Sequence, residues 1–200
     1  MLLFQRQARQ KPHLIWTRMT ENISSKTTDI SFRPAVDADA DLIAALVNSA
    51  YRGDSSRQGW TTEADLLQGS RIFPPEVREL IANPDSVILL CLQGDDIIGC
   101  VNLEKTEGAA YLGMFVVRPV LQGNGIGKHF MQTAEQYAQD LWGIQKIWMT
   151  VISVRKELIA YYERRGYVRT GRFKPFPSDN GKEQMLVDNL QFEEMEKILG

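Results

Sequence analysis

The sequence has few of the residues that cross-link small proteins or bind metals. Only two cysteines, Cys91 and Cys100, and two histidines, His13 and His129, occur among its 200 residues. These numbers are too small for a disulfide framework or for a zinc site built from cysteine and histidine. Each cysteine also lies inside an apolar run, which favours a buried core position. We therefore expect neither a disulfide nor a metal site.

Long apolar runs and a strong charge of one sign are also missing. No segment reaches the roughly 20 apolar residues of a membrane-spanning helix, so we expect no membrane partner. The net charge of −2 argues against a general nucleic-acid binder. Hydrophobic residues make up 44% of the chain, which indicates a globular protein, and the length suits one domain with a substantial core.

The first twenty positions contain no acidic residue. They hold four basic residues, Arg6, Arg9, Lys11 and Arg18. The remaining 180 residues therefore carry a net charge of −6. Such a start is found in transit peptides, but it lacks the apolar core of a secretory signal. We instead expect an extended or mobile leader at residues 1–28, a domain at residues 29–200 and a cytoplasmic protein. Met19 as the natural start stays open.

Hydrophobic periodicity predicts a single α+β domain around a mixed sheet, without internal repeats. Strands are predicted at 30–36, 87–93, 96–105, 109–117, 146–152, 167–171 and 190–198. Helices are predicted at 37–52, 61–69, 74–84, 125–141 and 155–166.

Glycine recurs at every second position in the segment LQGNGIGK, residues 121–128, between a predicted strand and a predicted helix. The first N–H groups of a helix lack partners within it, and the helix dipole makes that end positive. Glycines also let a ligand approach the main chain. The loop therefore predicts a site for a pyrophosphate or similar anion, with a purely structural turn as the alternative.

Two well-known phosphate loops do not fit this segment. A Walker A loop needs glycine where the chain has Gln122 and serine or threonine where it has His129. A dinucleotide fingerprint needs its third glycine where the chain has Lys128. The spacing that does fit is Gln-x-x-Gly-x-Gly, formed by Gln122, Gly125 and Gly127.

At these residues the sequence resembles the GNAT superfamily of N-acetyltransferases, whose acetyl-CoA loop has the form Gln/Arg-x-x-Gly-x-Gly/Ala. The match extends to Val-x-Pro at 117–119 and to YYERRGY at 161–167, which is similar to the Tyr-x-x-x-Gly-Phe/Tyr helix end of that family. The chain looks closest to small bacterial-type acetyltransferases of undefined substrate. The resemblance implies a three-layer α+β fold with a mixed, mostly antiparallel central sheet flanked by helices.

The resemblance also implies acetyl-CoA as co-substrate and no metal. The main chain of Phe115, Val116 and Val117 would pair with the pantetheine arm, and one N–H would polarise the thioester carbonyl. The loop would hold the pyrophosphate through Gln122, Gly123, Asn124, Gly125, Ile126, Gly127 and Lys128. Arg155 stands where many members have an asparagine that touches CoA, so it is either a further contact or a solvent-facing helix start.

By the same resemblance, Tyr162 is the acid that protonates the thiolate leaving group, because it precedes Gly166 by four residues. Its neighbour Tyr161 would point elsewhere. The general base is not implied, since Tyr111 and Thr150 stand where members of the family carry glutamates.

Glu104 is the nearest acidic candidate for the base and would act through water, unless it is a plain exposed carboxylate. The resemblance places Trp60, Glu63 and Phe176 at the acceptor groove, where the acidic residues of the region would favour a cationic amine. A capping box between Thr62 and Asp65 is the alternative for the segment around Glu63.

We therefore expect transfer of an acetyl group from acetyl-CoA to a primary amine or amino acid, by direct attack in a ternary complex. One alternative is a catalytically silent module that binds or senses acyl-CoA, and another is a protein N-acetyltransferase. No nucleic acid is expected as a partner, and a homodimer stays open.

Overall fold

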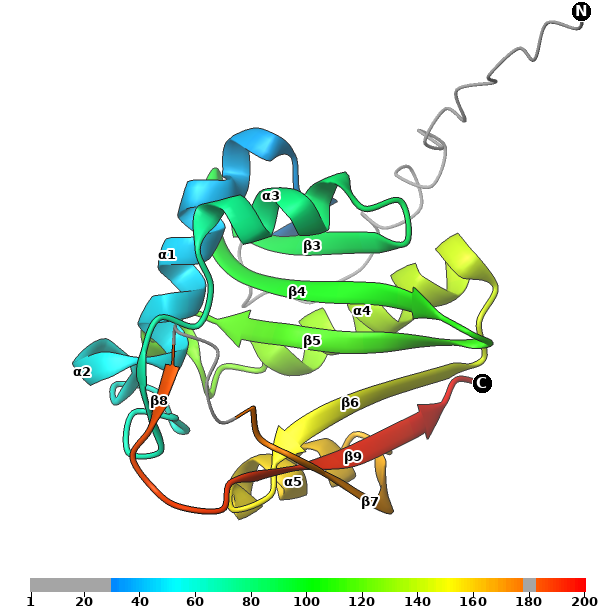
Figure 1. Ribbon diagram of the computed structural model, residues 1–200. Helices are drawn as coiled ribbons and strands as arrows, with labels where there is room; N and C mark the ends of the chain where they lie inside the picture. The colour runs from blue at the N-terminus through cyan, green and yellow to red at the C-terminus, as the bar shows by residue number, and fades with distance from the viewer. Residues whose placement is uncertain (1–29, 178–182) are drawn as a thin grey trace, which may run out of the picture.

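The computed structural model describes residues 30–177 and 183–200, which form a seven-stranded sheet with helices on both faces (Figure 1). Across the sheet the strands are β1 (Ile30–Pro34), β3 (Ser86–Gln93), β4 (Asp96–Thr106), β5 (Ala109–Val117), β6 (Lys146–Ile152), β9 (Gln191–Ile198) and β7 (Val168–Pro175). The pair β5–β6 is parallel and the other described neighbours are antiparallel. The expected mixed, mostly antiparallel sheet is confirmed.

Successive residues of a strand point to opposite faces of the sheet, so each face has its own apolar core. The helices cover these two cores and form the outer layers. Leu89 and Cys91 belong to the core under α4 (Ile126–Trp142) and α5 (Lys156–Glu163). Their neighbours Ile88 and Leu90 belong to the core under α1 (Ala40–Tyr51) and α3 (Pro74–Ala82). Cys91 and Cys100 are both buried and free.

The sheet opens between β5 and β6. Their pairing is limited to Ala110 with Ile147 and Tyr111 with Trp148. The register between β4 and β5 also shifts, so that Met114 and Phe115 of β5 lie opposite one residue of β4, and Met114 has a φ of +50°. This bulge bends β5 away from β6 and leaves main-chain groups of β5 facing the opening.

One expected helix is wrong. Residues 61–69 form a turn followed by β2 (Leu67–Gly69), which pairs with β8 (Glu183–Met185). The Thr62 hydroxyl accepts a hydrogen bond from Ala64 N at 3.0 Å and contacts the Ser56 hydroxyl at 2.5 Å, so it closes a turn instead of capping a helix.

Three short helical turns complete the architecture: η2 (Asp37–Asp39), α2 (Gly53–Ser56) and η3 (Pro119–Leu121). The predicted leader, residues 1–28, lies outside the described residues. Within residues 30–177 and 183–200, no helix is long and apolar enough to cross a membrane.

Candidate active site

Two cavities meet where β5 and β6 separate. The larger one has a volume of about 380 Å³ and is bordered by the glycine loop and α5. The smaller one has a volume of about 270 Å³ and reaches along β6 towards β8. Five residues line both cavities, namely Tyr51, Phe115, Arg155, Leu158 and Tyr162. A group held in one cavity is therefore within reach of a group held in the other.

The glycine loop supplies one wall of the larger cavity. Gly125 is the N-cap of α4 with a φ of +82°, and Gly123 has a φ of +85°. A Cβ at either position would meet no atom within 4 Å, so glycine is required by the backbone conformation and not by crowding. Gly123, Gly125, Gly127 and Lys128 all line the cavity. The unpaired N–H groups that begin α4 thus lie at its edge.

Three other loop residues have side chains engaged elsewhere or exposed, although Gln122 also lines the larger cavity, and their part in holding a pyrophosphate stays a prediction. Gln122 donates from Nε2 to Val117 O at 2.9 Å, and its Oε1 accepts from Trp60 N at 3.1 Å. Its side chain therefore fastens the loop to β5 and to the preceding segment. Asn124 is exposed, and Ile126 packs into the core, so neither side chain lines the cavity.

The charged side chains that line the larger cavity are all basic among the described residues: Lys128, Arg155, Arg164 and Arg165. Trp60 and Tyr161 form an aromatic wall there, with ring centroids 5.3 Å apart, and the Arg165 guanidinium lies 3.2 Å from the Tyr161 ring centre. Trp60 was expected at the acceptor groove, and Tyr161 was expected to point elsewhere. Both line the larger cavity, where the Trp60 ring lies against Tyr161 of α5.

Tyr162 lies at the junction of the two cavities and is buried. Burial raises its pKa well above the ordinary tyrosine value, so the phenol keeps its proton at neutral pH. No residue in the described ranges forms a hydrogen bond with its hydroxyl. On the other side of the junction, the Tyr51 hydroxyl donates to Phe115 O at 3.2 Å, beside the bulge. Of these two tyrosines, Tyr162 is therefore the one whose proton is free for a ligand.

A buried ion-pair network forms the wall of the smaller cavity. Glu63 Oε2 accepts a hydrogen bond from Arg52 at 2.6 Å, and Oε1 accepts one from Arg155 at 2.6 Å. Arg155 also donates to Thr61 Oγ1 at 2.7 Å, so its guanidinium is held by protein groups. Arg52 pairs in addition with Glu183 from β8. Arg52 and Glu183 have no local sequence signal, because they are 131 residues apart.

Comparison with known families agrees with this arrangement. Residues 42–167 match the Acetyltransferase (GNAT) family. The protein belongs to the GNAT family of acetyltransferases. This family uses acyl-CoA. A search of curated proteins found no significant match.

Solved GNAT structures share the fold at low sequence identity. A spermidine N-acetyltransferase from Vibrio cholerae, in complex with CoA and spermine, aligns with a TM-score of 0.62 and 18% identity over 85% of this chain and 95% of its own. A GNAT acetyltransferase from Streptococcus pneumoniae aligns with a TM-score of 0.59 and 17% identity over 86% and 100%. An IAA acetyltransferase from Bacillus cereus aligns with a TM-score of 0.62 and 14% identity over 86% and 100%. These similarities confirm the GNAT-like fold.

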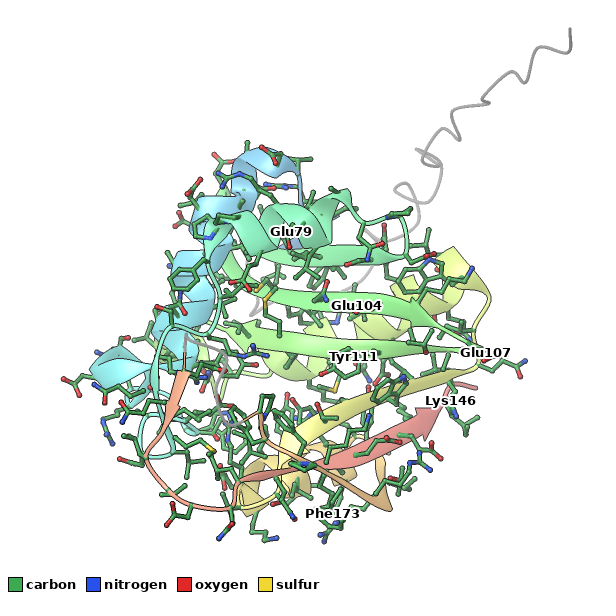
Figure 2. The ribbon with its side chains drawn as sticks, in the orientation of Figure 1. Glu79, Glu104, Glu107, Tyr111, Lys146 and Phe173 are labelled. Atoms are coloured by element: carbon green, nitrogen blue, oxygen red, sulfur yellow. The ribbon has the colours of Figure 1, made fainter. Side chains whose placement is uncertain are left out.

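The two positions at which the resemblance would place a glutamate are occupied by a hydroxyl pair. The hydroxyls of Tyr111 and Thr150 lie 3.1 Å apart, and both residues line the smaller cavity. Glu104, the expected base, lines neither cavity and accepts a hydrogen bond from Asn102 at 2.6 Å. It sits on β4 opposite Tyr111, so β5 lies between it and the opening (Figure 2). Glu63 and Phe176 do line the smaller cavity, and their acceptor role stays a prediction.

Proposed function

We propose that this GNAT acetyltransferase transfers an acetyl group from acetyl-CoA to a primary amine by direct attack in a ternary complex. The observation that carries the proposal is the meeting of two cavities at Tyr162 and Phe115. One cavity suits a long phosphorylated donor and the other suits a small acceptor. Two reactants held in this way react as if at very high local concentration.

The larger cavity fits the chemistry of CoA. Gly123 and Gly125 leave the beginning of α4 open to a pyrophosphate, and Lys128 adds a positive charge beside it. The main-chain groups of Phe115, Val116 and Val117 face the opening, where an extended pantetheine arm adds to the sheet as a strand does. A main-chain N–H of this segment then polarises the thioester carbonyl.

The proton transfers of the reaction are shared between Tyr162 and water. In the reaction the new N–C bond forms as the C–S bond breaks, and the sulfur leaves as a thiolate. Tyr162 donates its proton to that sulfur and regains one from water. Among the described residues, the carboxylates that line the smaller cavity are Glu63 and Glu183, and both are engaged by Arg52. The acceptor nitrogen therefore gives up two protons to water, the ammonium proton before the attack and a second one as the amide forms, and the Tyr111–Thr150 hydroxyl pair offers a path for them.

A thiol-release assay with acetyl-CoA and a panel of amines, amino acids and peptides tests this proposal. We expect release that depends on a small amine, since Phe176 and Pro177 border the smaller cavity. Calorimetric binding of CoA without thiol release from any acceptor would instead support a silent acyl-CoA binding module. Release with peptides alone would support a protein N-acetyltransferase.

A further inference from the structure

The smaller cavity carries a surplus positive charge. Its charged lining residues, among those the structure describes, are three arginines and two glutamates: Arg52, Arg71, Arg155, Glu63 and Glu183. The described ion pairs of the two glutamates use Arg52 and Arg155. Both oxygens of Glu63 are occupied, one by each arginine. This leaves Arg71 as the cation that the described network does not neutralise.

Arg71 is held in place by its main chain. Arg71 lies in the segment between β2 and α3, and its main-chain N–H donates to Asn48 Oδ1 at 2.7 Å. Its guanidinium carbon lies 6.0 Å from the Tyr51 ring centre. In the described part of the chain, no residue forms a hydrogen bond or an ion pair with its guanidinium. The five donors of that group are therefore available to a ligand in the cavity.

The charge on Arg71 is stable. Burial lowers its pKa, but the neighbouring Tyr51, Glu63 and Glu183 raise it, and the net direction is upward. A guanidinium of this kind binds carboxylates and phosphonates through two parallel hydrogen bonds. A purely cationic acceptor gains nothing from Glu63, whose charge is already shared by two arginines, and is repelled by Arg71.

We propose that the acceptor is an amine that also carries a carboxylate or similar oxyanion, and that Arg71 binds this second group. The inference rests on the proposed function and narrows its substrate class. It reverses the expectation from the sequence that acidic residues select a cationic amine. Glu63 is neutralised by two arginines, Glu104 lies on β4, one strand beyond β5, and lines neither cavity, and Asp65 is exposed and paired with Arg57.

Matched acceptors test the proposal. We would measure acetylation of α-amino acids, of their α-amides, of aminoalkylphosphonates of similar length and of spermidine. Charge-assisted hydrogen bonds contribute about 1.5–3 kcal/mol, so we expect each accepted acid to exceed its amide in kcat/KM by roughly 10- to 100-fold. The series with the higher kcat/KM, carboxylate or phosphonate, shows which oxyanion Arg71 binds. Equal use of acid and amide, or preferential use of spermidine, would overturn the proposal.

Variants assign the effect to Arg71. Arg71→Gln should raise KM for the acid with little change in kcat and should abolish the preference for acid over amide. Arg71→Lys should keep part of that preference, because it retains a charge but not the planar fork. The control is Arg78→Gln, since Arg78 is partly exposed, pairs with Asp41 and lines neither cavity. An acid preference that survives in a folded Arg71→Gln protein would contradict the assignment.

Binding separates this inference from the proposed function. Amino acids and amides are titrated into the CoA-bound protein by calorimetry, which needs no turnover. If no acceptor releases thiol, the proposed function fails. The inference still stands if the wild type binds an acid that Arg71→Gln does not, and it fails if neither protein binds one.

Discussion

Glu63 accepts a hydrogen bond from Arg155 at 2.6 Å, and this contact joins the wall of the smaller cavity to the start of α5. Arg155 is the N-cap residue of α5, the helix that carries Tyr162. The same carboxylate binds Arg52 at the end of α1. One buried glutamate thus connects two helices that border the site.

Replacing this carboxylate should destabilise the fold. Glu63→Gln leaves two buried guanidinium groups without their shared anion, a change that costs about 3–5 kcal/mol in buried pairs. Urea denaturation measures the loss. Asp65→Asn is the matched control, because its pair with Arg57 is exposed, and it should change the unfolding free energy by less than about 0.5 kcal/mol. Equal stability of the two variants would show that the network contributes nothing.

The hydroxyl of Tyr162 should matter for turnover and not for binding. Tyr162→Phe keeps the buried ring, and we expect kcat to fall roughly 10²-fold with little change in CoA affinity. Tyr161→Phe is the control for kcat, because it removes a hydroxyl one residue earlier on the same helix, keeps the ring that lines the larger cavity, and should leave kcat nearly unchanged. If the Tyr161 variant is the damaged one, the roles of the two tyrosines are exchanged.

The glycine loop should be essential for CoA affinity. Gly125→Glu places a negative side chain at the beginning of α4, where the pyrophosphate is expected. It also forces a non-glycine residue to a φ of +82°, which costs about 1–2 kcal/mol. Gly143→Glu controls for that strain, since Gly143 ends the same helix at a φ of +65° and lines neither cavity. Calorimetry should show CoA binding lost only in the first variant; equal affinity in both would refute the loop assignment.

No carboxylate on β4 should act as the base. Because β5 separates Glu104 from the opening, Glu104→Gln should leave kcat/KM unchanged across pH, in contrast to the moderate loss expected if it worked through water. A folded Glu104→Gln enzyme without activity would make Glu104 the base after all.

The dependence of kcat on pH follows from the burial of Tyr162. Since burial raises the pKa of Tyr162, its acid form is fully present below about pH 10. kcat should therefore not decline between pH 7 and 10, while kcat/KM should rise with pH as the acceptor amine loses its proton. A decline in kcat above pH 8 that disappears in Tyr162→Phe would mean that the phenol titrates there.

The parts that the sequence predicted are local. The loop at 121–128, the strand before it and the helix that carries Tyr162 each lie in one continuous segment, so their patterns could be read directly. The charged wall of the smaller cavity could not be predicted, because Arg52 and Glu183 meet only through the pairing of β2 with β8. That Glu104 lines neither cavity could not be predicted for a similar reason, since it depends on the order of the strands in the sheet.

Other errors came from competing local signals. The residues around Thr62 read equally well as a helix cap, but the hydroxyl closes a turn with Ser56. That turn carries Trp60 to the larger cavity, where its main-chain N–H bonds Gln122. A Cβ on Gly59 would lie 2.6 Å from the same Gln122 oxygen, so this neighbouring glycine permits the contact.

Under the proposed function, the acetyl group moves from CoA to an amine at the junction beside Tyr162. The most direct measurement is mass spectrometry of acceptor mixtures incubated with the enzyme and trideuterated acetyl-CoA. We predict a labelled N-acetyl amine that forms in step with free CoA and far more slowly with Tyr162→Phe. Saturable CoA binding with no labelled amine from any acceptor would contradict the account.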